Sequence, residues 1–252
     1  MDALILAAGF GSRLQGSEPS KPLARIGGRT LLEIAVVQLA RAGATRVVVA
    51  TGYRAEEIEA ALPGIAARTR IPVEARRVAD CRQSNGHSVL AGAADFDGPF
   101  LLVMADHLLS DGVFEALAAA PSPENGVMLA VDRRIDHPLL DAEDATWVAT
   151  GDRNRITRIG KTIDPFDAVD CGAFLATPGL LDAIRAAIAA GKAGSLSEGM
   201  QQLADAGRAF VADIGNAWWL DVDDERSLTL ARALAPRHIA PAQTAPTQAI
   251  AQ

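Results

Sequence analysis

The residues best suited to chemistry begin with a small-residue loop that follows an apolar run and carries two basic side chains: Leu6, Ala7, Ala8, Gly9, Gly11, Ser12, Arg13 and Lys21. Glycines let the backbone approach a ligand closely, and the exposed N–H groups of such a loop can hold phosphate oxygens. The loop lacks the third glycine of the dinucleotide fingerprint and the Gly-Lys-Ser/Thr ending of a P-loop. It therefore predicts a phosphate-binding turn that belongs to neither of those classes.

Two aspartates that lie far apart in the sequence each follow an apolar segment. Asp106 follows the run 101–104, and Asp221 follows a pair of tryptophans. Open parallel sheets bind ligands at the carboxyl ends of their strands, and Mg²⁺ prefers carboxylate and phosphate oxygens. We expect Asp106 and Asp221 to hold Mg²⁺, with Asp223 as a further candidate ligand. The alternative is that each aspartate caps a turn or a following helix.

The elements that must position these residues alternate between strands and helices. Short apolar runs predict strands at 3–7, 46–50, 73–75, 100–104 and 127–131, and periodic segments predict helices at 31–42, 55–62, 88–94 and 112–119. Thr30 and Glu33 form the pattern of a capping box at the first helix. This alternation predicts an α/β fold with a mostly parallel sheet covered by helices on both faces.

The pattern changes beyond about residue 140. A polar hairpin is expected at 146–149 and 155–159, followed by a strand at 168–176, helices at 180–190 and 196–206, a strand at 209–213 and a helix at 225–234. No linker-like stretch separates these elements from the first 140 residues. We therefore expect one domain over 1–234, with a second lobe over 141–234. Residues 235–252, which have no periodic apolar face, are expected to form a disordered tail.

Composition narrows the class of protein. The chain has 252 residues, of which 49% are hydrophobic, and a net charge of −7, which argues against a nucleic-acid-binding protein. No run approaches the 18 or so apolar residues of a membrane span, and the first apolar run lacks the basic start of a signal peptide. The two cysteines are far apart and have no metal-type spacing. We expect a cytoplasmic protein that neither inserts into membranes nor binds nucleic acid.

Taken together, these strings resemble the signature of the sugar-phosphate nucleotidylyltransferase family. The resemblance extends to about residue 234 and is carried in order by Gly9-Phe10-Gly11-Ser12-Arg13-Leu14, Lys21-Pro22-Leu23, Ser84-Asn85-Gly86-His87-Ser88, Met104-Ala105-Asp106-His107, Ile159-Gly160-Lys161, Val169-Asp170-Cys171-Gly172, Leu196-Ser197-Glu198 and Trp219-Leu220-Asp221-Val222-Asp223. Several strings are similar to the inositol-1-phosphate cytidylyltransferase subgroup. The resemblance implies a Rossmann-like, mostly parallel mixed sheet flanked by helices, of the nucleotide-diphospho-sugar transferase type, with a C-terminal acceptor-binding lobe.

The resemblance also implies roles for individual residues. Arg13 and Lys21 would be catalytic, and the nucleotide would contact the first loop together with Asn85, Gly86, Ser88 and Asp106. The acceptor would contact His107, Lys161, Asp170, Gly172 and Glu198. Carboxylates accept hydrogen bonds from hydroxyl groups, and a lysine attracts a phosphate. Ordinary alternatives stay open for several of these: a helix cap for Ser88, Asp170 or Glu198, and an exposed surface lysine for Lys161.

The reaction implied by the resemblance is Mg²⁺-dependent transfer of a cytidylyl group from CTP to inositol 1-phosphate or a similar phosphorylated alcohol, with release of pyrophosphate. No membrane part follows, so we expect a stand-alone enzyme whose product passes to a separate membrane phosphotransferase. Alternatives are uridylyl or guanylyl transfer to a sugar 1-phosphate, cytidylyl transfer to phosphocholine or a phosphonate, and a nucleotide-binding protein without activity. A dinucleotide-dependent oxidoreductase is disfavoured because Ala50-Thr51-Gly52-Tyr53 stands where an acidic residue is needed.

Overall fold

The N-terminal half of the chain forms a parallel sheet. The computed structural model describes residues 1–11 and 20–239. Its parallel strands, in chain order, are β1 (Asp2–Ala7), β4 (Arg46–Thr51), β5 (Val73–Arg77) and β6 (Phe100–Met104). They lie in the order β6-β1-β4-β5, and Leu4 of β1 is in register with Val48 and Leu102 on either side. Apart from Asp2, the residues of β1 are buried because this central strand is covered on both faces.

A second set of strands extends the same sheet beyond β6. These strands are β8 (Val127–Asp132), β9 (Trp147–Thr150), β10 (Ile156–Gly160), β11 (Ala168–Ala176) and β12 (Ala209–Asp213). β11 runs antiparallel to β6, β8 and β9, whereas β12 runs parallel to β8. The result is one mixed sheet of nine strands, so the predicted second lobe continues the sheet of the first. The predicted mixed α/β sheet is confirmed.

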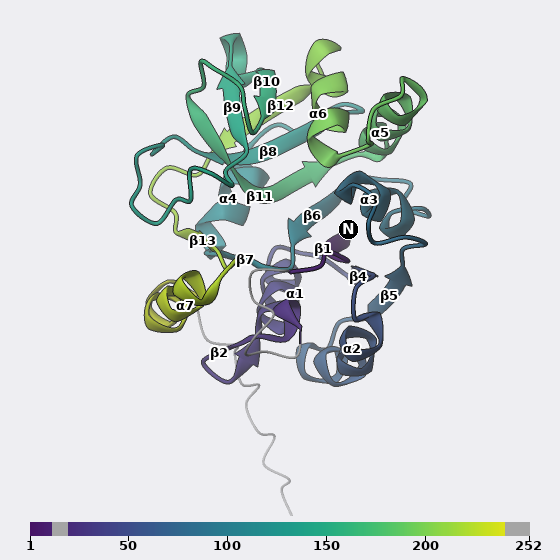
Figure 1. Ribbon diagram of the computed structural model, residues 1–252, viewed down its shortest axis with the longest axis vertical. Coiled ribbons are helices and arrows are strands. Elements are labelled where there is room, and N and C mark those ends of the chain that lie inside the picture. Colours follow the sequence, from purple (N-terminus) through teal and green to yellow (C-terminus); the bar gives the residue numbers. More distant parts are fainter. Residues whose placement is uncertain (12–19, 240–252) are drawn as a thin grey trace, which may run out of the picture.

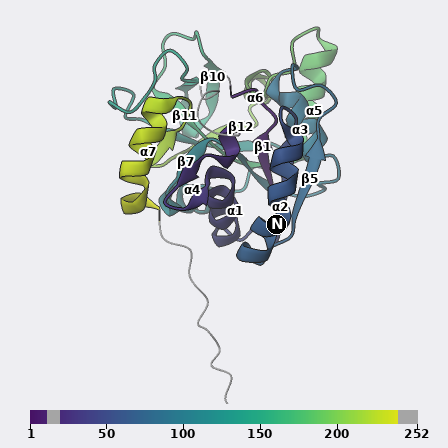
Figure 2. The ribbon, with the colours of Figure 1, turned by 60° about the horizontal axis from the view of Figure 1, so that its bottom comes forward.

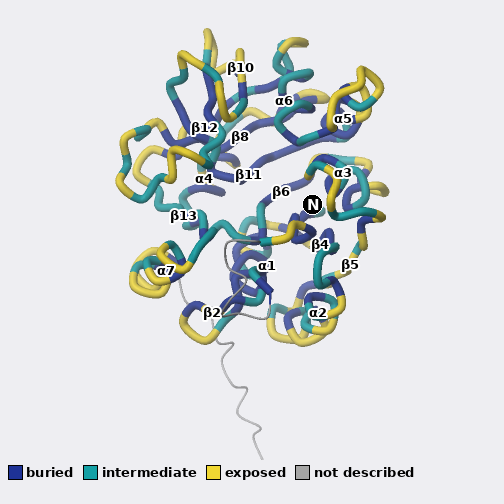
Figure 3. Tube along the Cα trace, viewed as in Figure 1, coloured by how far each residue is buried: buried dark blue, intermediate teal, exposed yellow. Residues whose placement is uncertain are grey.

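Helices cover both faces of this sheet (Figures 1 and 2). One face packs against α1 (Leu31–Arg41), α2 (Ala55–Thr69) and α4 (Asp111–Ala119). The other face packs against α3 (Asn85–Gly92), α5 (Pro178–Ala189) and α6 (Leu196–Asp205). Successive side chains of a strand point to opposite faces, so Ile5 belongs to the first cluster and Leu4 to the second. Figure 3 shows the buried strands between helices whose outer sides are exposed.

A third cluster of apolar residues holds the last helix, α7 (Glu225–His238), beside two small strand pairs. One pair joins β2 (Arg25–Ile26) to β3 (Arg29–Thr30), and the other joins β7 (His107–Leu109) to β13 (Trp219–Asp221). In the second pair Asp221 lies directly opposite His107. Short 3₁₀ turns occur at Lys21–Leu23 and Asp152–Asn154. Figures 1 and 2 both show α7 and α5 on opposite sides of the molecule.

Three element boundaries differ from the sequence predictions by three or more residues. Helix α2 was expected to end at Leu62, but it continues through Pro63 because Ile58, Leu62 and Ile65 form one buried stripe. Helix α3 was expected to start at Ser88, a residue type favoured as a helix cap, but it starts at Asn85 with Ser84 as its cap.

The predicted tail also begins too early. α7 continues to His238 because Ala235 and Ile239 are buried in the third cluster. Residues 240–252, the rest of that predicted tail, lie outside the described residues. Over 1–11 and 20–239, no helix combines the length and apolar character needed to cross a membrane.

Candidate active site

A lysine lies between two aspartates that come from distant parts of the chain. Lys21 sits in the 3₁₀ turn after the first loop, and its Nζ lies 2.6 Å from Asp106 Oδ2 at the end of β6. Lys21 Nζ also donates to Asp223 Oδ1, just beyond the end of β13. The Lys21 side chain is 9% exposed, against 29% for Asp106 and 19% for Asp223. The structure therefore brings together Lys21 and Asp106, which the sequence placed in one site.

Electrostatic coupling keeps this cluster charged. Burial opposes the positive charge of Lys21, but Asp106, Asp221 and Asp223 outweigh it and raise the Lys21 pKa above its ordinary value. Burial likewise opposes the charge of Asp106, but Lys21 and His107 outweigh it and hold the Asp106 pKa well below its usual range. Lys21 is therefore an ammonium and Asp106 a carboxylate throughout the physiological pH range.

His107 lies between the two aspartates predicted to hold the metal. Its Nδ1 is 2.9 Å from Asp106 Oδ1 and 3.6 Å from Asp221 Oδ1. Burial alone would lower the His107 pKa, but Asp221 and Asp106 raise it to about 9. Burial, together with repulsion from Asp106 and Asp223, raises the Asp221 pKa to about 8. Without a metal, a protonated His107 thus pairs with the Asp106 carboxylate, while the Asp221 carboxyl group beside it keeps its proton below about pH 8.

The acidic cluster fits a hard, oxygen-preferring cation. Ligand atoms of Asp106, His107 and Asp221 lie within 4.8 Å of one another, and so do those of Asp144, Asp221 and Asp223. Asp221 Oδ1 is buried and accepts no hydrogen bond among the described residues. A buried polar atom without a partner is costly, and a divalent cation would satisfy this one. The orphaned oxygen therefore supports the predicted use of Asp106 and Asp221 as ligands.

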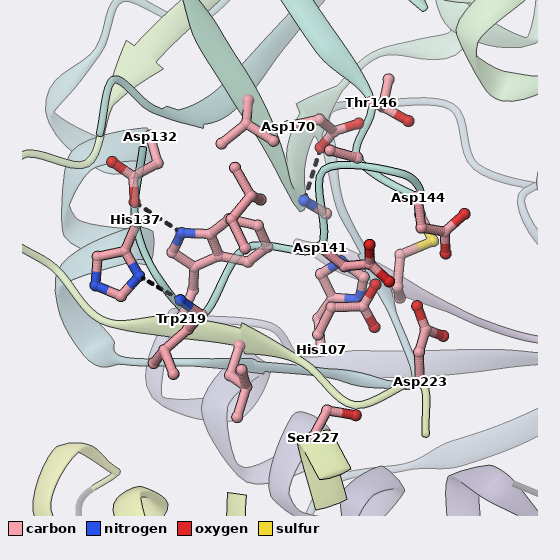
Figure 4. Close-up of a pocket in the computed structure, with 18 of the residues that line it drawn as sticks. His107, Asp132, His137, Asp141, Asp144, Thr146, Asp170, Trp219, Asp223 and Ser227 are labelled. Atoms are coloured by element: carbon pink, nitrogen blue, oxygen red, sulfur yellow. Dashed lines mark hydrogen bonds and ion pairs between the residues drawn. The ribbon is translucent and has the colours of Figure 1, made fainter. Parts of the chain in front are cut away.

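Two cavities meet at this cluster. The smaller, of about 260 Å³, is lined by the first loop together with Lys21, Asp106 and Asp223. The larger, of about 780 Å³, is lined by residues of both lobes, including Asp221 and Asp223. Because Asp223 lines both, two bound molecules could meet beside it. Figure 4 shows Asp141, Asp144 and Asp223 on one side of His107 in the larger cavity.

The described part of the first loop, predicted to bind phosphate, lines the smaller cavity. Leu6, Ala7, Gly9 and Gly11 line the smaller cavity, whereas Ala8 is buried and its carbonyl accepts from Tyr53 N at 3.1 Å. Gly11 has a φ of +54°, and a Cβ there would lie 2.9 Å from Lys21 Cβ. Glycine thus lets the loop pass close to Lys21. Ser12 and Arg13 lie outside the described residues.

The segment with Asn85, Gly86 and Ser88, predicted to contact the nucleotide, connects α3 to the second lobe. Asn85 lines the larger cavity, and its Oδ1 accepts from Leu196 N at 2.8 Å. Gly86 packs against the carbonyl of Gly194, and Ser88 is buried within α3. Gly86 and Ser88 are not among the residues lining the two cavities. The structure accounts for these residues by packing, and their contact with a nucleotide stays a prediction.

Four of the five predicted acceptor residues surround the larger cavity: His107, Lys161, Asp170 and Gly172. Lys161 forms an ion pair with Asp144. Asp170 Oδ1 accepts from Gly172 N at 2.7 Å, and burial raises the Asp170 pKa to about 6. Gly172 has a φ of +73°, and a Cβ there would lie 2.5 Å from His107 Cδ2. Gly172 therefore leaves room for the His107 ring.

Glu198, the fifth predicted acceptor residue, caps a helix in this structure. Its Oε2 accepts from Ser195 N at 2.8 Å, and Ser195 Oγ accepts from Glu198 N at 3.2 Å. This is a complete capping box at the start of α6. Glu198 is also not among the residues that line the larger cavity. The alternative held open for it, a helix cap, is the role that the geometry supports.

Sequence reasoning missed several residues of this site. Asp144 lies in an irregular loop, where no pattern announced it. Asp132 ends the apolar strand β8, as Asp106 follows β6, and that shared position was a usable signal. Asp132 Oδ2 accepts from Trp219 Nε1 at 2.9 Å (Figure 4). Trp219 lines the larger cavity and stacks on His107.

Comparison with known proteins identifies the relatives of this chain. The pattern of a family described as "MobA-like NTP transferase domain" matches residues 3–158. Over 234 residues the chain is 32% identical to the "Bifunctional IPC transferase and DIPP synthase" of Rubrobacter xylanophilus, which covers 92% of this chain and 51% of the relative. Over 175 residues it is 31% identical to the protein of the same name from Archaeoglobus fulgidus, covering 69% of this chain and 32% of the relative. The chain thus spans about half of the first relative and about a third of the second.

Solved structures share the fold. The chain superposes on the inositol-1-phosphate CTP transferase from T. maritima with a TM-score of 0.79 and 24% identity, covering 95% of this chain and 98% of the other. A UDP-glucose pyrophosphorylase complexed with UDP-glucose gives a TM-score of 0.76 and 17% identity, with coverages of 93% and 98%. These likenesses confirm the predicted nucleotide-diphospho-sugar transferase type of fold.

Proposed function

Because the chain belongs to the MobA-like NTP transferase family, we propose that it transfers a cytidylyl group from CTP to inositol 1-phosphate or a similar phosphorylated alcohol. The products would be a CDP-alcohol and pyrophosphate. The observation that carries this proposal is the position of Lys21, an ammonium held between Asp106 and Asp223 where the two cavities meet. A triphosphate in the smaller cavity and a phosphate ester in the larger one would face each other across this cluster.

The reaction requires little from the protein beyond alignment and charge neutralisation. A phosphate oxygen of the acceptor attacks the α-phosphorus of CTP, a new P–O bond forms, and the bond from that phosphorus to the bridging oxygen breaks. The electron pair leaves with pyrophosphate, and the ionised acceptor has no proton to lose. Lys21 would offset the negative charge that builds on pyrophosphate. Arg13, which lies outside the described residues, is proposed to act beside it.

We propose that Mg²⁺ binds to Asp106 and Asp221. The donor set consists of carboxylate oxygens, and one of them, Asp221 Oδ1, is buried without a hydrogen-bond partner. When bound, Mg²⁺ would supply Lewis-acid stabilisation of the phosphate oxygens and would orient the triphosphate. Asp223 already pairs with Lys21, so it would act as a ligand only if that ion pair opens.

The acceptor assignment rests on the larger cavity and on the relatives. Lys161 would bind the acceptor phosphate after leaving Asp144, and Asp170 would accept hydrogen bonds from its hydroxyl groups. The relative of known structure named an inositol-1-phosphate CTP transferase matches nearly the whole chain. The cytoplasmic location stays a prediction, as does a separate membrane phosphotransferase that would consume the CDP-alcohol.

A second candidate is uridylyl transfer to a sugar 1-phosphate. The similar fold of a UDP-glucose pyrophosphorylase supports it, since acceptor choice depends on a few side chains of the second lobe. The same experiment separates the two reactions. Pyrophosphate release is measured for each of the four nucleoside triphosphates with a panel containing inositol 1-phosphate, glucose 1-phosphate and phosphocholine.

We expect the highest kcat/KM for CTP with inositol 1-phosphate and no turnover without Mg²⁺. The matched variants are Lys21→Met and Lys192→Met. The kcat of Lys21→Met should fall about 10²–10³-fold. Lys192 is exposed and lies outside both cavities, so Lys192→Met should match the wild type. Turnover with no pair of substrates would refute the proposal, and a preference for UTP with glucose 1-phosphate would replace it with the second candidate.

A further inference from the structure

Asp132 is a buried carboxylate at the end of β8 with a full set of hydrogen bonds. Its side chain is 3% exposed. Oδ1 accepts from Arg134 N and Arg134 Nε, both at 2.8 Å. Oδ2 accepts from Arg134 Nη2 at 2.7 Å and from Trp219 Nε1 at 2.9 Å (Figure 4). A buried carboxylate that accepts four hydrogen bonds is held in one orientation. Asp132 Oδ2 is therefore a fixed acceptor for the Trp219 indole N–H.

Trp219 connects this carboxylate to the metal cluster. Its ring stacks on the His107 imidazole with centroids 6.0 Å apart and planes inclined by 17°. His107 Nδ1 in turn faces Asp106 at 2.9 Å and Asp221 at 3.6 Å. A continuous series of contacts therefore leads from Asp132, through the indole and the imidazole, to the two carboxylates that we propose as Mg²⁺ ligands.

The strand that carries Trp219 and Asp221 needs such a support. β13 has three residues and pairs with β7, which also has three. These two strands form a separate sheet from the nine-stranded one. An isolated pair this short is marginally stable in water. The Asp132–Trp219 bond ties β13 to β8 of the large sheet, and Arg134 Nη2 adds a bond to the carbonyl of Ala217 at 2.7 Å.

We propose that Asp132 is a positioning residue of the metal site, which acts through the Trp219 indole to fix the distance between Asp106 and Asp221. This inference rests on the proposed function, because it concerns how the chain holds the Mg²⁺ ligands. It assigns to Asp132 and Trp219 no contact with the reacting atoms. Residues that orient the ligands of a metal commonly change its affinity by about 10–100-fold when they are replaced.

Trp219→Phe isolates the role of the indole N–H. The substitution removes the donor to Asp132 and keeps an aromatic ring against His107, while the three bonds from Arg134 still satisfy Asp132. The matched control is Trp147→Phe. Trp147 is 8% exposed, stacks on Phe166 with centroids 4.1 Å apart, and lines neither cavity.

The measurement is Mn²⁺ binding to the full chain without nucleotide, followed by electron paramagnetic resonance, with thermal unfolding of the metal-free protein in parallel. We expect the Mn²⁺ Kd of Trp219→Phe to rise about tenfold and that of Trp147→Phe to equal the wild-type value, even where both melt at lower temperature. Asp132→Asn, which keeps one acceptor oxygen but loses the charge, should raise the Kd as well. If Trp219→Phe does not fold, the Mn²⁺ Kd of Asp132→Asn tests the proposal.

Two results would overturn the inference in different ways. Unchanged Mn²⁺ binding in both Trp219→Phe and Asp132→Asn would show that these residues support only the fold, and the proposed function would stand. Wild-type protein that binds no Mn²⁺, or Asp221→Asn protein that binds it as the wild type does, would remove the proposed metal site and the inference with it.

Discussion

Replacing Lys21 by methionine should move three properties in different directions. Lys21 neutralises Asp106 and Asp223 in the free protein, competes with Mg²⁺ for the same carboxylates, and would stabilise the leaving pyrophosphate during transfer. Lys21→Met should therefore lower the stability of the metal-free protein, tighten Mg²⁺ binding and slow the reaction. A residue that only packed would lower stability without strengthening the binding of a cation.

The burial of Lys21, Asp106 and Asp223 sets the expected loss of stability in Lys21→Met. Lys21 is 9% exposed, so removing it leaves two aspartates close together without their cation. Breaking a buried ion pair costs about 3–5 kcal/mol, and the partial exposure of both aspartates favours the lower value of about 3 kcal/mol. In a domain of this size that loss lowers Tm by about 6–12 °C. Loss of a charge that stabilises the transition state should reduce kcat by about 10²–10³-fold.

The assay compares Lys21→Met with Lys192→Met in thermal unfolding, with and without Mg²⁺, and in pyrophosphate release. Mg²⁺ should restore a larger part of the lost Tm in Lys21→Met than it adds to the wild type, because the ion replaces the missing charge. Lys192→Met should behave like the wild type in each measurement. Weaker Mg²⁺ binding in Lys21→Met, or normal turnover, would refute the role given to this lysine.

Three further predictions concern the same site. The affinity of the free protein for Mg²⁺ should fall about tenfold per pH unit below about pH 8. The Asp221 pKa is about 8, so below that pH the metal must displace a proton from Asp221. A Mg²⁺ Kd that calorimetry finds constant from pH 6 to 8 would contradict this. Lys161→Met should raise the KM for inositol 1-phosphate about tenfold without changing that for CTP, whereas equal rises would deny it the phosphate-binding role. Gly172→Ala should lower Tm by more than Gly191→Ala and should also weaken Mg²⁺ binding. Both glycines have positive φ, but only a Cβ at position 172 would clash with His107. Equal losses of Tm in the two variants would refute this packing argument.

Local signals in the sequence were enough to predict most of the sheet and the family. The central residues of β1 and β4, and all of β6, are apolar because these strands are buried on both faces, and such runs are easy to recognise. The Thr30 cap was also correct, although only half of the expected capping box forms. Thr30 Oγ1 accepts from Glu33 N at 3.1 Å, while the Glu33 carboxylate bonds Arg68 instead.

The parts that were missed depend on contacts between distant segments. β7 and β13 have three residues each, too few to show a period, and they exist because they pair with each other. The ion pair of Asp144 with Lys161 and the bond from Trp219 to Asp132 likewise join positions far apart in the chain. A single sequence does not reveal such pairs, because each member alone has the composition of an ordinary loop or core.

Glu198 illustrates how one string can carry two signals, and its contact with an acceptor stays a prediction. Its position in a family-like string suggested acceptor binding, but the same Ser-x-x-Glu spacing is a local capping signal, and the structure uses it in that way. Asp106 and Asp221 were placed by a more general argument, since both follow apolar segments that lead to the ligand-binding edge of the sheet. The structure brings an oxygen of each carboxyl group within 3.6 Å of His107 Nδ1.

We propose that Asp106 and Asp221 bind one metal ion and that Lys21 contacts the polyphosphate bound beside it. Anomalous diffraction from a crystal of the protein with CTP and Mn²⁺ tests it most directly. We expect a Mn²⁺ peak within about 2.0–2.3 Å of carboxylate oxygens of both aspartates, with the triphosphate in contact with Lys21 Nζ. A metal bound away from Asp106 and Asp221, or a triphosphate that leaves Lys21 paired with Asp223, would contradict it.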